Sequence, residues 1–278
     1  MVVFAGQGDA RRSMFLLWRA EQPARPRRGP APGPRPGLSV DAIVTAAIAV
    51  ADEDGMAALS MRAVGERLGR TAMALYTYVP GKSELLDLMY DAVHAELPTE
   101  YADAADWRAA LTDWAHDTLA FHLRHPWVLQ VSQARPVLGP HEYTALDTLV
   151  RLLNRTGLDA ALLRRLIGTL THFLRGCAGT VAEARQAAAE TGESDEEWWY
   201  ARSALLGEVA PDFADRYPGL SAMERASAPQ PPPAAPGDEA MPYLEREARE
   251  TFTVGLGVLL DGIDAAIRAR PVSRTRGR

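Results

Sequence analysis

The chain has 278 residues, of which 47% are hydrophobic and 24% charged, so it is long enough for one large or two modest domains with buried cores. Cys177 is the only cysteine, which excludes disulfide frameworks and cysteine-based zinc sites. The apolar run at residues 14–18 is too short for a signal-peptide core, and no stretch approaches the roughly 20 apolar residues of a membrane span. We therefore expect a soluble, cytoplasmic protein.

The net charge of −6 is distributed unevenly along the chain. Residues 1–37 carry seven arginines against two acidic residues, and residues 268–278 carry five arginines and no acid. The region between them is acidic, and residues 38–97 hold four basic residues against nine acidic ones. Basic ends on an acidic body indicate that nucleic acid, if bound, meets local patches and not the whole surface.

Residues 1–37 are expected to form a disordered arm that is rich in arginine and proline. Between residues 20 and 37 proline removes backbone donors, and few apolar side chains are available for burial. The arm either contacts DNA or serves as a solvated linker, and Met14 is an alternative first residue.

Two helices are predicted to follow the arm. The first begins after Ser39, a favourable N-cap, and ends before Gly55. Ser60 caps the second, in which Gly65 would let a third helix approach closely. The buried face of the second helix is expected to hold Met61, Val64 and Leu68.

The third helix is short, from Ala72 to Tyr78, with Thr71 as its cap and with Leu75 and Tyr76 as its core contacts. Gly69 supplies the turn that precedes it. A fourth helix is predicted from a cap at Ser83 through Leu97. Two short helices joined by a tight turn are the layout of a helix-turn-helix, whose second helix enters the DNA major groove.

Every segment beyond Pro98 has helical periodicity, and no strand-like alternation stands out. A proline-rich stretch at about residues 226–239 interrupts this region before the last helix. The predicted fold is therefore all-α. The predicted helices span residues 107–124, 141–154, 158–191 and 241–268.

Residues 43–86 carry a specific combination of motifs: EDG at 53–55, LSMR at 59–62, GERLG at 65–69, and LYxYVxxKxxLL at 75–86. This combination resembles the DNA-binding domain of the tetracycline-repressor (TetR) family of bacterial regulators. Residues 107–180 and 252–263 are similar to the regulatory domain of the tetracycline repressors, including its last dimer helix. The resemblance implies a homodimeric, one-component transcriptional regulator, most often a repressor, that binds a palindromic operator.

The resemblance also implies the residues that contact double-stranded DNA. Arg62 would read a guanine, whereas Tyr76, Tyr78 and Lys82 would hold phosphates. Arg70 replaces the usual apolar residue of the family and is expected to point outward, where a phosphate could reach it. The expected contact residues are Ser60, Arg62, Arg70, Thr71, Ala72, Met73, Ala74, Tyr76, Thr77, Tyr78 and Lys82.

A small-molecule effector is expected to bind a largely apolar pocket in the regulatory domain. The positions at which tetracycline repressors hold metal- and drug-binding groups carry Pro98, Val131, Ala134 and Thr180 here, so we expect a different effector and no metal. The aromatic pair Trp198-Trp199 either stacks on the ligand or covers a helix or a partner subunit. The expected pocket residues are Trp114, His122, Trp127, Val131, His172, Phe173, Trp198 and Trp199.

His116, His122 and His125 lie near one helix face, but no carboxylate or cysteine completes a metal site, so pocket lining or core packing is favoured. No nucleophile has a supporting base, so neither an enzyme nor a cofactor is predicted. The alternative function is a ligand-binding helical protein with weak or lost DNA binding, which would act as a scavenger or accessory protein.

The predicted organisation is a DNA-binding domain with its connecting helix over residues 38–97 and a ligand-binding and dimerisation domain over 98–270, followed by a basic tail at 271–278. The helices at 158–191 and 241–268 are expected to pack against their symmetry mates as a four-helix bundle. A ligand that fits better when the two recognition helices are wrongly spaced would then release the operator.

Overall fold

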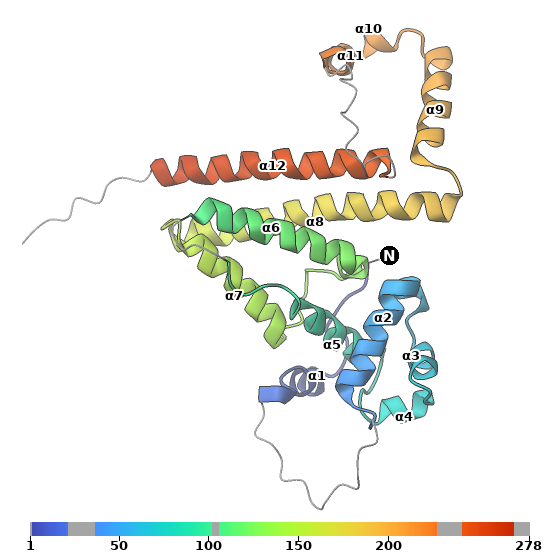
Figure 1. Ribbon diagram of the computed structural model, residues 1–278, viewed down its shortest axis with the longest axis vertical. Helices are drawn as coiled ribbons and strands as arrows, with labels where there is room; N and C mark the ends of the chain where they lie inside the picture. The colour runs from blue at the N-terminus through green and yellow to red at the C-terminus, as the bar shows by residue number, and fades with distance from the viewer. Residues whose placement is uncertain (1, 22–36, 102–105, 227–240, 270–278) are drawn as a thin grey trace, which may run out of the picture. The chain divides into compact units, whose positions relative to one another are not determined.

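The computed structural model describes residues 2–21, 37–101, 106–226 and 241–269, and Figure 1 shows these as an assembly of helices. In this part of the chain the extended backbone pairs only at an isolated bridge between Val3 and Val131, so the predicted all-α class is confirmed. The chain divides into two compact units, residues 1–176 with 256–278 and residues 177–255. No helix among the described residues is long and apolar enough to cross a membrane.

The expectation of a disordered arm over residues 1–37 is wrong for its first part. Helix α1 (Ala10–Leu17) starts at Asp9, whose carboxylate accepts from the backbone N–H of Arg12 at 2.8 Å, and the short helix η1 (Arg19–Glu21) follows. Ala5 and Leu17 are buried in the core of the first unit. Burial of these apolar side chains stabilises the segment despite its basic composition. The rest of the predicted arm, residues 22–36, lies outside the described residues.

Helix α2 (Val40–Ala58) begins where the sequence predicts, because the Ser39 side chain accepts from the backbone N–H of Ala42 at 3.1 Å. Gly55 interrupts the helix with a φ of 77°, a left-handed conformation that favours glycine. The predicted end of the regular helix at this residue is therefore confirmed.

Helices α3 (Met61–Arg67) and α4 (Ala72–Tyr76) form the helix-turn-helix, and the predicted caps Ser60 and Thr71 are both confirmed. The two helices approach so closely at Gly65 that an added Cβ would lie 2.7 Å from the carbonyl oxygen of Arg70. Gly69 makes the turn with a φ of 62°.

Helix α4 is shorter than predicted and buries a single face. Leu75 is fully buried, but Tyr76, a predicted core contact, is 42% exposed. A helix of little more than one turn cannot bury two consecutive residues, since they point about 100° apart. The buried Val79, which follows α4, fills the core instead.

Helix α5 (Lys82–His94) is the central helix of the first unit and packs against α1, α2 and α7 (Pro140–Asn154). It begins after Gly81 without a side-chain cap and ends three residues before the predicted Leu97, so the predicted cap at Ser83 is wrong. Because the helix starts at Lys82, Ser83 lies inside the first turn and not at the cap position.

Three carboxylates on α5 are buried: Glu84, Asp87 and Asp91. Glu84 and Asp87 accept from the backbone N–H groups of Asp9 and Gly6 at 3.3 and 2.8 Å, which fixes the N-terminal segment. Asp91 accepts from the first backbone N–H groups of α7, at 2.9 and 3.0 Å, and so caps that helix. Burial raises the pKa of Asp87 and Asp91, and these hydrogen bonds act in the opposite direction.

Helix α6 (Trp107–Arg124) has the predicted bounds, and a short 3-10 helix, η2 (Pro126–Gln130), continues from its end. The long helices α8 (Ala160–Thr191) and α12 (Tyr243–Arg268) agree with prediction to within two residues at each end. In the second unit, Glu245 is buried and accepts from Arg185 at 2.7 and 2.8 Å. The second unit also contains α9 (Asp195–Val209), α10 (Phe213–Arg216) and α11 (Pro218–Ala226).

Two predicted segments lie largely or wholly beyond the part of the chain that the structure describes. The first is the proline-rich loop at about residues 226–239, of which residue 226 alone is described, and the second is the basic tail at 271–278.

Gly65→Ala should destabilise the protein by about 1–3 kcal/mol, because the new methyl group would meet backbone atoms that cannot move independently. Urea unfolding followed by circular dichroism measures the change. Gly168→Ala is the matched control, since an added Cβ on that α8 glycine meets nothing within 4 Å. It should be neutral or stabilising by up to about 1 kcal/mol. Equal unfolding midpoints for both variants would contradict the close approach of α3 and α4.

Candidate DNA-binding surface and ligand pocket

The helix-turn-helix leaves most of the predicted DNA-contact side chains exposed. The Arg62 side chain is 80% exposed and Met73 is 75% exposed. Ser60 and Thr71 use their hydroxyl oxygens as helix caps, so they position the backbone as well as facing outward. Also exposed are Arg70, Thr77, Tyr76, Tyr78 and Lys82, whereas Ser60, Ala72 and Ala74 are half-buried.

Lys82 is held at the edge of this surface. Its Nζ donates to the carbonyl oxygen of Leu59 at 2.7 Å, which ties the start of α5 to the residues before α3. Lys82 is exposed and its ammonium group has three donors, so it can also donate to a phosphate oxygen.

The acidic residues of segment 38–97 lie mostly away from these side chains. Three of them are buried on α5, as described above, and Glu53 pairs with Arg67 at 2.5 Å. Glu66 is the exception, because it forms an i, i+4 pair with Arg62 at 2.6 Å. The excess of acids in this segment is therefore not a measure of the charge around the predicted contact residues.

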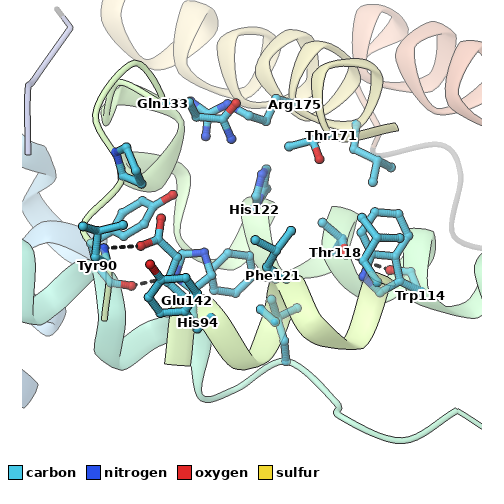
Figure 2. Close-up of a pocket in the computed structure, with 18 residues that line it drawn as sticks. Tyr90, His94, Trp114, Thr118, Phe121, His122, Gln133, Glu142, Thr171 and Arg175 are labelled. Atoms are coloured by element: carbon cyan, nitrogen blue, oxygen red, sulfur yellow. Dashed lines mark hydrogen bonds between the residues drawn. The ribbon is translucent and has the colours of Figure 1, made fainter. Parts of the chain in front are cut away.

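An apolar pocket of about 280 Å³ lies between α5, α6, α7 and the first half of α8. Figure 2 shows its lining, in which aromatic and aliphatic side chains surround a few polar groups. Every lining residue belongs to the first compact unit. The polar and aromatic residues that bear on ligand chemistry are Tyr90, His94, Trp114, Thr118, Phe121, His122, Gln133, Glu142, Thr171 and Arg175.

Two of the predicted ligand residues, Trp114 and His122, line this pocket, and the other six do not. Trp127 is buried in the core, and Val131 lines a smaller cavity of about 110 Å³. The α8 residues His172 and Phe173 are exposed and half-buried, respectively, and neither lines the pocket. Trp198 and Trp199 lie exposed on α9 in the second unit and are not among the residues that line this pocket.

The sequence analysis missed the pocket residues on α5, α7 and α8. Tyr90 and His94 are spaced i, i+4 on α5, which is also the spacing of a core face, so periodicity alone cannot separate the two roles. Arg175 interrupts an apolar face of α8, and this is the one signal that could have indicated a polar site.

Two histidines in the pocket are held neutral, of which His122 is buried and His94 half-buried. Burial lowers the pKa of His94 to about 4 and that of His122 to about 3. The Nδ1 atom of His94 is 2.6 Å from the carbonyl oxygen of Tyr90. The buried Nδ1 of His122 has no hydrogen-bond partner among the described residues. His122 and His125 do not share a site, since His125 pairs with carboxylates outside the pocket.

Arg175 places a half-buried guanidinium group at the pocket wall. It donates to the carbonyl oxygens of Leu129 and Val131 at 2.8 and 3.2 Å, and burial lowers its pKa. None of the described carboxylates forms an ion pair with it. Glu142 is the acidic lining residue, and its carboxylate accepts from the backbone N–H of Leu138 at 2.6 Å while burial raises its pKa.

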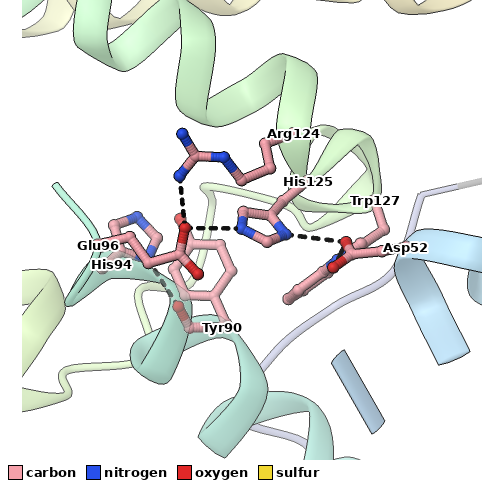
Figure 3. Close-up of polar contacts among 7 residues, drawn as sticks. All are labelled: Asp52, Tyr90, His94, Glu96, Arg124, His125 and Trp127. Atoms are coloured by element: carbon pink, nitrogen blue, oxygen red, sulfur yellow. Dashed lines mark hydrogen bonds and ion pairs between the residues drawn. The ribbon is translucent and has the colours of Figure 1, made fainter. Parts of the chain in front are cut away.

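A buried histidine connects α2, which packs against α3 of the helix-turn-helix, to the end of the pocket helix α6. Figure 3 shows His125, which follows the last residue of α6, between Asp52 of α2 and Glu96. Its Nδ1 lies 2.8 Å from Asp52 and its Nε2 lies 3.1 Å from Glu96. The Trp127 indole N–H donates to the same Asp52 oxygen at 2.8 Å, and Arg124 donates to Glu96 at 2.6 Å. We call these five residues the His125 bridge.

The comparisons with known proteins agree with this architecture. The family model described as tetracyclin repressor-like, C-terminal domain, matches residues 98–267, and the model of bacterial regulatory proteins, tetR family, matches residues 43–89. The HTH-type transcriptional repressor DrrR1 of Streptomyces coeruleorubidus is 36% identical over 268 residues, which cover 96% of this chain and 90% of that protein.

Solved structures of bacterial regulators have the same fold. The TetR regulator SCO7222 of Streptomyces coelicolor has a TM-score of 0.55 at 26% identity, with 82% of this chain and 99% of that chain covered. Apo ActR from the same organism has a TM-score of 0.61 at 20% identity, with 85% and 99% covered.

His122→Leu should remove a pH-dependent destabilisation of the folded state. The folded pKa of about 3 lies below the ordinary 6.5, so the unfolded chain binds the proton first and stability is lost as the pH falls below about 6.5. Relative to the wild type, the unfolding free energy of the variant should rise by about 1.4 kcal/mol for each unit by which the pH is lowered between pH 6 and 4. Urea unfolding across this range measures it.

Thr118→Val is the control for that experiment, because it alters the pocket wall without removing a titrating group. It should shift the stability curve without changing its slope. Parallel curves for the wild type and His122→Leu would show that His122 is not buried in its neutral form.

Proposed function

The chain belongs to the tetracycline-repressor family of bacterial regulatory proteins, and we propose that it is a homodimeric repressor released from a palindromic operator by a small molecule. The proposal includes residues 38–97 as the DNA-binding domain and 98–270 as the ligand-binding and dimerisation domain. One observation carries it: an apolar pocket and a helix-turn-helix lie in one compact unit, and the His125 bridge joins the end of the pocket helix α6 to α2, which packs against α3. The relative named as a repressor supports the direction of regulation.

The proposed DNA contacts divide into readers and anchors. Arg62 would read a guanine, with apolar contact from Met73 to a thymine methyl group. Tyr76, Tyr78 and Lys82 would bind phosphates and fix the register. In a dimer, two such surfaces about 34–36 Å apart would face successive major grooves of a palindromic site.

The His125 bridge supplies a physical route from ligand to DNA. Helix α6 lines the pocket with Trp114, Phe121 and His122, and the bridge begins at its C-terminal end. A ligand that moves this end displaces His125 and, through Asp52, the helix α2 that supports α3. The ligand then lowers DNA affinity by the factor by which DNA lowers ligand affinity.

Dimerisation is proposed through α8 and α12, as the family resemblance implies. Helix α12 exposes Val254 and Val258, which are 68% and 65% accessible and lie one turn apart on the same face. Apolar side chains on a long helix are stabilised when a second copy covers them.

Arg62→Ala should weaken binding to the preferred duplex by about 1–3 kcal/mol and relax the preference at one base pair. In vitro selection from a random duplex library, followed by fluorescence anisotropy, measures both quantities. Arg151→Ala, at an exposed α7 arginine that forms ion pairs with the exposed Glu100 and Asp147, should change neither. An unchanged base preference in the Arg62 variant would eliminate its role as a reader.

The double variant Val254→Glu, Val258→Glu should convert the dimer to a monomer, because it places four like charges in the proposed interface. Sedimentation equilibrium at micromolar concentration should give two chains for the wild type and one for the variant. Val209→Glu, on the exposed face of α9, should stay dimeric. A monomeric wild type would overturn the proposed interface.

A further inference from the structure

We propose that the effector is an aromatic molecule with an anionic oxygen, a carboxylate or an acidic phenol, which pairs with Arg175 and hydrogen-bonds to His122. The inference rests on the proposed function, because it assigns a chemical class to the effector of the same pocket. It starts from two polar groups in the pocket whose hydrogen-bonding capacity or charge the protein leaves uncompensated.

Arg175 is the first of these groups. A guanidinium group taken out of water is costly unless an anion compensates its charge. Here the partners of Arg175 are carbonyl oxygens of residues 128–131, which accept hydrogen bonds but carry no net charge. The side chain lines the pocket, so an anionic ligand can supply the missing charge within a largely apolar enclosure.

His122 is the second group. Its ring is buried and lines the same pocket, and its Nδ1 has no hydrogen-bond partner among the described residues. In Figure 2 the ring points toward the side of the pocket where Gln133, Arg175 and Thr171 lie. Burial and the nearby positive charge of Arg175 both keep the imidazole neutral, so it can accept from a ligand hydroxyl or donate to a ligand oxygen.

The other lining residues favour an aromatic skeleton for the anionic ligand. Trp114, Phe121 and Tyr90 present aromatic surfaces, with Leu146, Leu149 and Leu174 between them. Flat aromatic rings fit such a surface better than flexible polar chains. Glu142 would repel an anion when ionised, but burial raises its pKa and so opposes that charge, while its carboxylate accepts from the backbone N–H of Leu138. Arg175 is therefore the group that determines the sign of the ligand charge.

A pair of fluorescent probes tests this charge preference. 8-Anilinonaphthalene-1-sulfonate and N-phenyl-1-naphthylamine share one aromatic frame and differ in the sulfonate. Arg175→Gln should lower the affinity for the sulfonate probe by about tenfold or more, as expected for the loss of a charge-assisted contact. The affinity for the neutral probe should change by no more than about twofold. Arg175→Lys should restore much of the loss.

Arg164→Gln is the matched control, since this arginine is exposed on the same helix and away from the pocket lining. It should bind both probes as the wild type does. If Arg175→Gln lowers the affinity for both probes equally while its unfolding midpoint stays native, Arg175 contributes to the shape of the pocket and not to charge recognition. That result would overturn the proposal. Unchanged affinity for both probes would overturn it as well.

If Arg175→Gln unfolds, His122→Leu and Arg175→Lys carry the test. His122→Leu should lower the affinity for the sulfonate probe more than the affinity for the neutral probe. Arg175→Lys should still bind the sulfonate probe more tightly than the neutral one. No preference of the wild type for the sulfonate probe would contradict the inference outright. The assay contains no DNA, so its failure is distinguishable from a failure of the proposed regulation, which would appear as absent operator binding.

Discussion

The contacts of one buried imidazole link segments that lie far apart along the first compact unit. His125 lies between carboxylates on two different helical segments, and its neighbours Arg124 and Trp127 bind the same two carboxylates. The His125 ring is buried, whereas the side chains of Asp52, Glu96 and Arg124 are 26%, 41% and 59% exposed. Because a buried imidazole that loses its partners is costly, a displacement of the end of α6 is expected to move α2 or to break these contacts.

The sequence predicted the local structure of the helix-turn-helix well, and the physical reason is that each signal is short-range. Ser39, Ser60 and Thr71 cap helices with their own side chains, and Gly65 is required by a contact only a few residues away. Ser83 failed as a cap because α5 begins one residue earlier, at Lys82, which places Ser83 inside the helix. Helix α1 was missed because its burial depends on Glu84 and Asp87, some 80 residues away.

The pocket was largely unpredictable because it depends on how four helices are rotated about their axes. Trp114 and His122 were found through their residue types, but Trp127 and Val131 are equally apolar and face the core. The excess of acidic residues in segment 38–97 was a poor guide to the charge of the DNA-binding surface for a related reason. Acids in the DNA-binding segment suggested a surface hostile to DNA, whereas Asp87 and Asp91 cap other segments internally. This removes the main observation that favoured a ligand-binding protein without DNA contact.

Linkage between pocket and DNA is the central claim, and one measurement tests it most directly. The affinity for 8-anilinonaphthalene-1-sulfonate is measured by fluorescence with and without a saturating selected duplex, and the signal that persists in Arg175→Gln is subtracted. The account predicts that DNA lowers the probe's affinity for the pocket, and that the probe lowers DNA affinity by the same factor. Equal probe affinity in the free and DNA-bound protein would contradict it.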